Sequence, residues 1–92
     1  MIVNVGFGNC VNSEKLLAVL WTDAAPVKRM IQMYREKGRL FDATAGRKTK
    51  SALCLEDDFC VLSALQPDTL AKRFNMDRTP GDMQQVEEFE EE

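Results

Sequence analysis

The chain has 92 residues, which allows one domain at most, and it contains no histidine. Histidine is the commonest metal ligand and the commonest general base near neutral pH, so its absence argues against a metal centre and against most enzyme classes. The net charge of −3 by itself argues against a nucleic-acid partner, since such domains usually carry a basic excess. Three cysteines in no paired motif, with no signal peptide or membrane-length apolar run, predict a reducing, cytoplasmic setting.

The charge divides unevenly along the chain. Residues 1–76 hold 11 lysines and arginines against 8 aspartates and glutamates, a balance of +3, whereas residues 77–92 hold one arginine against 7 acids, a balance of −6. We predict an ordered domain over residues 1–76 and an acidic, disordered tail over residues 77–92. So small a domain buries a small core, which makes self-association the expected source of further stability.

Two strands are predicted before the first helix. Ile2 to Val5 is apolar with β-branched residues, and Gly6 to Asn9 adds a glycine bend before Cys10 and Val11, so this segment reads as one bent strand. After a run of turn formers, Lys15 to Trp21 predicts a second strand. The Gly6-x-Gly8 pair lacks both the third glycine and the following helix of a dinucleotide-binding motif, which favours a purely structural bend.

A helix is predicted next, with Thr22 and Asp23 as caps, Pro26 in its first turn and Gly38 as its stop. Apolar side chains recur at i, i+3, i+4 and i+7, which indicates one buried face. These residues are Val27, Met30, Ile31 and Tyr34. On the opposite side is a polar stripe that solvent exposure alone would explain, and we keep it as a secondary binding candidate. It consists of Lys28, Gln32 and Arg35.

The second half of the domain reads as three strands and a short helix. The predicted strands are Leu40–Thr44, Ser51–Leu55 and Phe59–Leu65, and the helix begins at Pro67 and carries Leu70 and Phe74 on one face. This order does not alternate as a doubly wound parallel sheet would. The predicted class is α+β, with a small, mostly antiparallel sheet, one longer amphipathic helix and one short C-terminal helix.

Several polar and thiol groups have ordinary structural explanations. Asp57 and Asp58 lie in a predicted hairpin turn, where aspartates are favoured for backbone reasons, so we expect no metal there. Asp42 lies in a strand and is expected to pair with a nearby arginine. Cys54 and Cys60 could face each other across the hairpin, and buried structural thiols are the favoured interpretation. We predict no enzyme activity and no cofactor.

The segment Gly46-Arg47-Lys48-Thr49-Lys50 is the strongest candidate for a binding site. Three cations and a hydroxyl on an exposed bend can converge on phosphate oxygens, and Arg39 is a candidate to extend the patch. One short basic run is also a common solvated turn, and composition alone favours that simpler interpretation.

Five segments between Ile2 and Phe74 together resemble the RemA family, regulators of extracellular matrix genes in spore-forming bacteria. They are Asn4–Asn9 (NVGFGN), Ala25–Gln32 (APVKRMIQ), Asp42–Thr44 (DAT), Gly46–Thr49 (GRKT) and Leu62–Pro67 (LSALQP). The resemblance implies a subunit similar to LytTR-type DNA-binding domains, a homo-oligomeric ring, and basic surfaces around which DNA bends. The DNA-contacting arginines of the family map to Lys15, Arg47 and Lys48.

Two features depart from the family pattern. Lysines stand at Lys15, Lys48 and Lys50 where arginines are usual, and lysine attracts phosphate without the bidentate grip of arginine. The acidic tail is the second departure, since members of the family are expected to end soon after the closing helix. The tail could cover the basic bend and inhibit binding, or it could only keep the protein soluble.

The sequence therefore supports two hypotheses. The first is a cytoplasmic, nucleoid-associated transcriptional regulator or architectural protein that binds double-stranded DNA as a homo-oligomer, with contacts from Lys15, Arg47 and Lys48 and support from Lys50. The second is an oligomeric scaffold or interaction protein of RemA type with little DNA affinity. Neither hypothesis involves a membrane or a small-molecule substrate.

Overall fold

The computed structural model describes residues 1–74, which form six strands, one short 3-10 helix and two α-helices. In chain order these are β1 (Ile2–Asn4), β2 (Cys10–Asn12), η1 (Ser13–Lys15), β3 (Leu16–Trp21), α1 (Ala25–Glu36), β4 (Leu40–Asp42), β5 (Ser51–Leu55), β6 (Phe59–Ser63) and α2 (Pro67–Phe74). The predicted acidic tail lies outside the described residues. The α+β class is confirmed.

Four strands form the central sheet in the order β3-β5-β6-β4. The β3–β5 and β5–β6 pairs are antiparallel, as predicted, whereas β4 pairs with β6 in parallel, with Leu40 opposite Cys60. Between these two parallel strands the chain returns to the starting end of the sheet through β5, which is antiparallel to β6. Here the segment from residue 43 to residue 50 leads from β4 to β5, and it contains the basic bend.

The N-terminal segment differs from the prediction, because it is a two-stranded hairpin and not one bent strand. Strand β1 pairs antiparallel with β2, with Val3 opposite Val11. Between them Gly6, Phe7 and Gly8 all have positive φ values, of 117°, 53° and 78°. Three successive residues with positive φ reverse the chain direction, which a single bent strand does not require. The Lys15 position also differs, because η1 ends there before β3 begins.

Helix α1 begins and ends close to the predicted residues, but its cap differs. Gly38 has a φ of 71° and donates its amide to the carbonyl of Arg35 at 3.2 Å, while Arg39 N donates to Tyr34 O at 2.9 Å. This is the paired hydrogen bonding of a Schellman stop. The predicted caps are wrong: residue 24 is the N-cap and makes no side-chain bond, and the Thr22 hydroxyl donates to Thr49 O at 3.0 Å.

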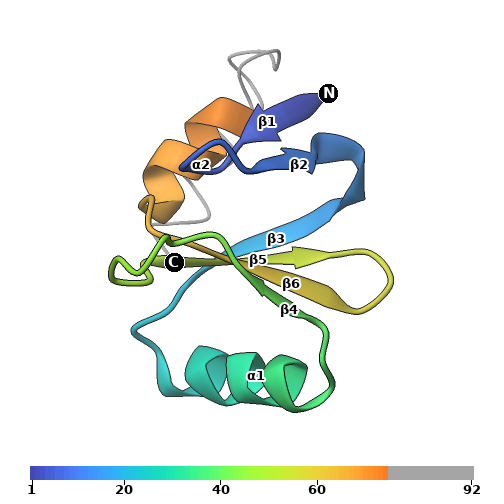
Figure 1. The fold of residues 1–92 in the computed structure, drawn as a ribbon, viewed down its shortest axis with the longest axis vertical. Helices are drawn as coiled ribbons and strands as arrows, with labels where there is room; N and C mark the ends of the chain where they lie inside the picture. The colour runs from blue at the N-terminus through green and yellow to red at the C-terminus, as the bar shows by residue number, and fades with distance from the viewer. Residues whose placement is uncertain (75–92) are drawn as a thin grey trace, which may run out of the picture.

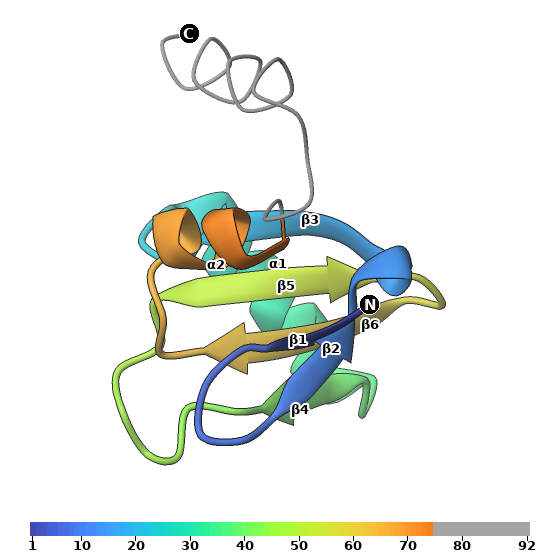
Figure 2. The ribbon, with the colours of Figure 1, turned by 90° about the horizontal axis from the view of Figure 1, so that it is seen from above.

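The sheet is covered on both faces, as Figure 1 shows, with α1 on one side and the β1–β2 hairpin and α2 on the other. Figure 2 shows α2 over β3 and the hairpin over β6 and β4. The predicted apolar face of α1 packs on Ala52, Cys60 and Leu62. Side chains of β5 alternate, so Leu53 points to the other face and packs in a cluster with Leu70 of α2.

Two buried serines connect the layers. The Ser63 hydroxyl donates to Val5 O at 2.7 Å and accepts a hydrogen bond from Leu65 N at 3.0 Å, and the Ser51 hydroxyl donates to Leu65 O at 2.6 Å. Both serines are fully buried, so these bonds satisfy groups that would otherwise cost free energy. They fix the hairpin and the start of α2 against the end of the sheet that carries the basic bend.

Candidate nucleic-acid interface

The basic bend begins with a turn that the sequence sets locally. The Asp42 carboxylate accepts hydrogen bonds from Thr44 N at 2.8 Å and from the Thr44 hydroxyl at 2.6 Å, and these bonds lower the pKa of Asp42. Ala45 and Gly46 then have φ values of 53° and 80°, and Arg47 N donates to Thr44 O at 3.0 Å. The expected ion pair of Asp42 with an arginine is wrong: within residues 1–74 Asp42 belongs to no ion pair, and Thr44 supplies its hydrogen-bond donors.

The bend is held at its far end as well. Lys50 N donates to Ser63 O at 2.9 Å, and Thr49 O accepts the hydroxyl of Thr22. These bonds involve backbone atoms of the bend, so its course does not depend on its charged side chains. Arg47 and Lys48 are exposed and Lys50 is half-buried. The bend therefore presents two cations on a fixed frame, with a third close beside them.

Arg47 lies against an aromatic ring that sequence reasoning missed. Its guanidinium carbon is 5.4 Å from the centroid of the Phe7 ring, which is within cation–π range. Phe7 is 53% exposed and has a left-handed backbone, an uncommon combination for a bulky residue. The signal in the sequence was the flexible Gly6-x-Gly8 pair, but nothing local shows that this loop meets a bend forty positions later.

Lys48 lies near α1. It lines a hollow between α1 and the bend together with Lys28 and Arg35, two members of the stripe kept as a secondary candidate. That stripe was predicted opposite the apolar face, but Lys28 and Arg35 flank it, since Ile31 lines the same hollow. Lys48 and Lys50 also border a smaller hollow beside Trp21.

Lys15 lies at the other end of the sheet from the bend. Leu16 is opposite Leu55 at one end of β5, and Trp21 is opposite Ser51 at the other. At the rise of a β-strand the two basic positions are about 20 Å apart. Lys15 Nζ lies 3.5 Å from Glu56 Oε2. Within one subunit the structure therefore brings together Arg47, Lys48 and Lys50 but not Lys15.

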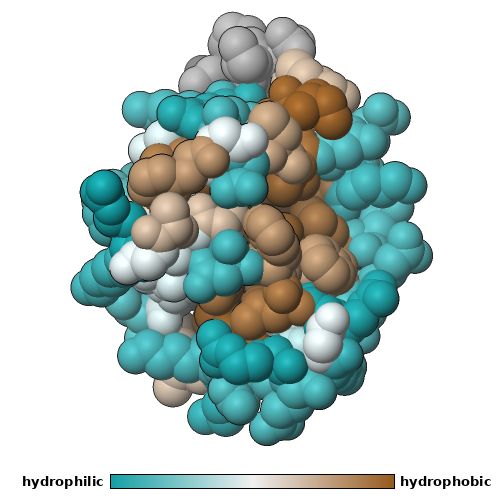
Figure 3. Space-filling view, in the orientation of Figure 1, coloured by the Kyte–Doolittle hydropathy of each residue, from teal (hydrophilic) through white to brown (hydrophobic). Residues whose placement is uncertain are grey.

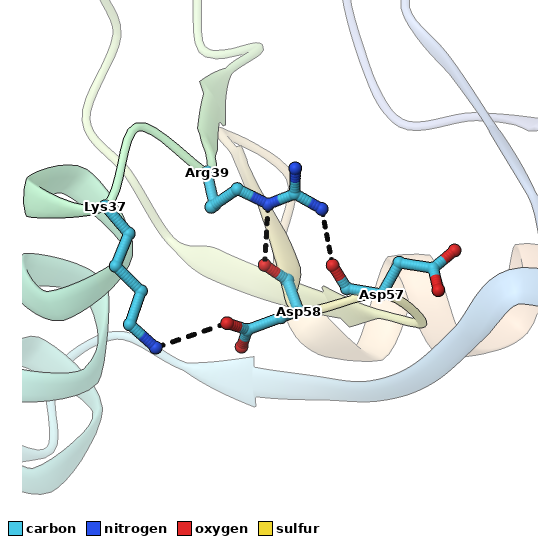
Figure 4. Close-up of polar contacts among 4 residues, drawn as sticks. All are labelled: Lys37, Arg39, Asp57 and Asp58. Carbon is cyan, nitrogen blue, oxygen red and sulfur yellow. Dashed lines mark hydrogen bonds and ion pairs between the residues drawn. The ribbon is translucent and has the colours of Figure 1, made fainter.

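Arg39 lies at the same end of the sheet as Lys15, beside Asp57 and Asp58. The idea that it extends the basic bend is therefore wrong. Figure 4 shows its guanidinium donating to the backbone carbonyls of Asp57 and Asp58, while Lys37 Nζ lies 3.2 Å from Asp58 Oδ2. Asp57 and Asp58 have positive φ values of 67° and 60°, which confirms turn chemistry as the reason for them. No cluster of three or more metal-ligating side chains is found within residues 1–74.

The thiols fit the structural interpretation. Cys54 lies directly opposite Cys60 in the β5–β6 pair, as the hairpin predicted, and both are free thiols. Burial raises the pKa of Cys60 to about 12 and also raises the pKa of Cys54. Since the thiolate is the reactive form, these two groups are poorly suited to nucleophilic or redox chemistry near neutral pH. Cys10, in contrast, is exposed.

We expect one rapidly reacting thiol in the native protein. A colorimetric disulfide reagent at neutral pH should titrate Cys10 quickly. Cys54 and Cys60 should react much more slowly until the protein unfolds, because Cys60 is buried, Cys54 is partly buried, and the raised pKa of each thiol keeps it protonated. Cys10→Ser should remove the fast phase. Rapid reaction of two or more thiols in the native protein would contradict the described packing.

An apolar hollow of about 460 Å³ opens between the β1–β2 hairpin and the sheet. Its walls include Val11 from the hairpin and Phe41, Leu55 and Phe59 from the sheet, with Lys15 at its edge. In Figure 3 hydrophobic atoms gather on this face, between the hairpin and β4. Several large side chains elsewhere are also exposed, including Leu17 and Trp21. An exposed, contiguous apolar patch often marks a site where a protein binds a partner.

The helices of residues 1–74 are all too short or too polar to cross a membrane. The described chain is thus a small α+β protein with a basic bend at one end of its sheet and a charge-balanced turn at the other. The model of the RemA-like family, described as extracellular matrix regulatory protein A-like, matches residues 2–74, and the chain belongs to this family.

Similar proteins from several bacteria are named regulatory proteins. One from Clostridium kluyveri is 40% identical over 89 residues, which cover 97% of this chain and 94% of that protein. One from Acetivibrio thermocellus is 46% identical over 74 residues, or 80% of each chain. One from Bacillus pumilus is 40% identical over 75 residues, or 82% of this chain and 84% of that protein.

The first of these alignments corrects one sequence expectation. It covers 97% of this chain, so it must extend well beyond Phe74 into the acidic C-terminal residues. The expectation that relatives end soon after the closing helix was therefore wrong for this relative.

Proposed function

We propose that this protein is a DNA-binding transcriptional regulator or architectural protein that contacts DNA phosphates through the basic bend. The observation that carries the proposal is that Arg47 and Lys48 are exposed and take part in no ion pair within residues 1–74. Lys15 and Lys37, in contrast, have carboxylate partners. Exposed cations on a bend that is held by hydrogen bonds to its backbone can neutralise phosphates at little reorganisation cost.

Lys15 is a second, weaker contact in this proposal. Its ion pair with Glu56 is solvent-exposed, and such pairs contribute about 0 to 1 kcal/mol, so a phosphate can displace the carboxylate. Lys48 and Lys50 act as point charges, whereas Arg47 can grip two phosphate oxygens. We therefore expect electrostatic attraction to dominate over geometric selectivity.

Self-association is part of the same proposal. The apolar hollow and the exposed Phe41, Leu17 and Trp21 offer surface that a second copy of the chain could bury. Repeating the bend around an oligomer would let one DNA molecule engage several weak sites at once, which raises affinity without new contacts. The ring, and the likeness to LytTR-type domains, stay predictions from the family resemblance.

The remaining predictions follow from this function. We propose a cytoplasmic, nucleoid-associated protein without cofactor, small-molecule substrate or enzyme activity, consistent with relatives that are named regulatory proteins. The apolar hollow favours a second candidate, an oligomeric scaffold of RemA type with little DNA affinity. The two candidates differ in whether the charge of the bend matters.

Salt dependence of DNA affinity tests the proposal. A labelled duplex of about 40 base pairs is titrated with the protein at about 50 and about 200 mM salt, with fluorescence anisotropy as the readout. If the oligomer neutralises roughly six to ten phosphates, affinity should fall by about three to five orders of magnitude over this range. Absence of binding even at the lower salt concentration would overturn the DNA proposal and leave the scaffold.

A further inference from the structure

The hollow between α1 and the bend gathers cations from two distant segments of the chain. It measures about 330 Å³. Its polar lining consists of Lys28 and Arg35 from α1, Lys48 and Thr49 from the bend, and Thr22 and Asp23 from the segment between β3 and α1. The lining therefore includes three cations and one carboxylate, that of Asp23.

The helix that carries two of these cations is firmly attached to the sheet. Ile31, between Lys28 and Arg35 on the helix surface, is buried and packs with Leu62 of β6, which also lines the hollow. The buried hydroxyl of Thr22 holds the bend beside the start of α1 by its bond to Thr49 O. The relative position of the three cations is therefore set by core packing and by the hydrogen bond from the Thr22 side chain to the backbone of the bend.

The charges in the hollow are not balanced within the described chain. Lys28, Arg35 and Lys48 take part in none of the ion pairs of residues 1–74, and Arg35 donates a hydrogen bond only to the neutral Gln32, at 3.1 Å. Arg35 helps to lower the pKa of Asp42, but the carboxylate of Asp42 is already engaged by Thr44. Like charges held close together repel one another, and an anion between them relieves that repulsion.

We propose that Lys28 and Arg35 complete the contact surface that Lys48 begins, so that the hollow receives a backbone phosphate of DNA. This inference rests on the proposed function and adds α1 to it. Arg35 supplies a planar guanidinium that can bond two phosphate oxygens, while Lys28 and Lys48 add charge from either side. The hydroxyls of Thr22 and Thr49 border the same space.

The test removes the two helix cations without touching the bend. Lys28→Gln/Arg35→Gln is compared with Arg29→Gln/Lys72→Gln, which also removes one lysine and one arginine from helix positions but spares the hollow. We expect the first variant to bind duplex DNA at least about tenfold more weakly than the control. Its plot of log affinity against log salt should also be shallower by about 0.9 for each phosphate that the variant no longer neutralises.

The outcomes separate this inference from the proposed function. No DNA binding by the wild type would overturn both. Wild-type binding, with the Lys28→Gln/Arg35→Gln variant equal to the control in affinity and salt slope, would overturn the role of α1 alone. Light scattering and thermal unfolding must show unchanged mass and stability. If the double variant does not fold, Lys28→Gln alone serves, since Lys28 is exposed, and an unchanged salt slope there would again count against the inference.

Discussion

Arg47→Ala/Lys48→Ala is expected to lose most of its affinity for duplex DNA while it keeps the mass that the wild type has in solution. Charge-assisted hydrogen bonds contribute about 1.5 to 3 kcal/mol each, so removing both side chains should weaken binding by about 100-fold or more. The bend itself should survive, because it is held by Arg47 N to Thr44 O and by Lys50 N to Ser63 O, both backbone bonds. Anisotropy of a labelled duplex measures the affinity and light scattering measures the mass.

A matched variant separates a local contact from a general loss of charge. Arg29→Ala/Lys72→Ala lowers the net charge by the same amount at helix positions away from the bend. If these residues act only through long-range attraction, their loss should weaken DNA binding modestly, and the difference from the wild type should shrink as salt is added. If both variants lost the same amount of DNA affinity, the bend would be no direct contact site and only the net charge would matter. Retention of wild-type affinity by Arg47→Ala/Lys48→Ala would remove the bend from the DNA-binding surface altogether.

The parts of the fold that the sequence predicted well have local causes. Helix α1 follows from the spacing of Val27, Met30, Ile31 and Tyr34 and from Gly38, whose left-handed φ ends it. The β5–β6 hairpin follows from two apolar runs around a turn of acids, and α2 from Pro67 at its first position. In each case the residues that determine the element lie within the element or next to it.

The parts that were wrong or missing depend on contacts between distant segments. Nothing near Arg39 shows that its side chain reaches the carbonyls of Asp57 and Asp58, because that contact requires β4 to lie beside β6. The placement of Phe7 under Arg47 likewise depends on the hairpin that closes over the sheet. The candidate site was thus predictable as a bend, but not its aromatic and helical neighbours.

The separation of Lys15 from the bend limits how DNA could bind. A duplex that touched both positions on one subunit would have to span about 20 Å, or roughly six base pairs. The same separation allows Lys15 of one subunit and the bend of another to meet the same stretch of duplex in an oligomer. Either way, Lys15 and the bend act as two contacts and not as one cluster.

Leu53→Ala is expected to lower the free energy of unfolding by about 2 to 5 kcal/mol. Leu53 is fully buried at the centre of β5, between Val19 of β3 and Val61 of β6, and it packs with Leu70 of α2. Its removal leaves a cavity where both sheet neighbours and the closing helix meet. In a domain of this size each kcal/mol lowers the melting temperature by about 4 to 8 °C. Urea unfolding followed by circular dichroism, at fixed protein concentration, measures the loss.

Leu17→Ala is the matched control, because it makes the same substitution at a leucine that is 66% exposed on β3. In the isolated subunit it should change the unfolding free energy by no more than about 0.5 kcal/mol. If Leu17 lies in a contact between copies, its removal should instead lower the mass measured by light scattering. A loss of folding stability as large as that of Leu53→Ala, at unchanged mass, would contradict the described burial of both leucines.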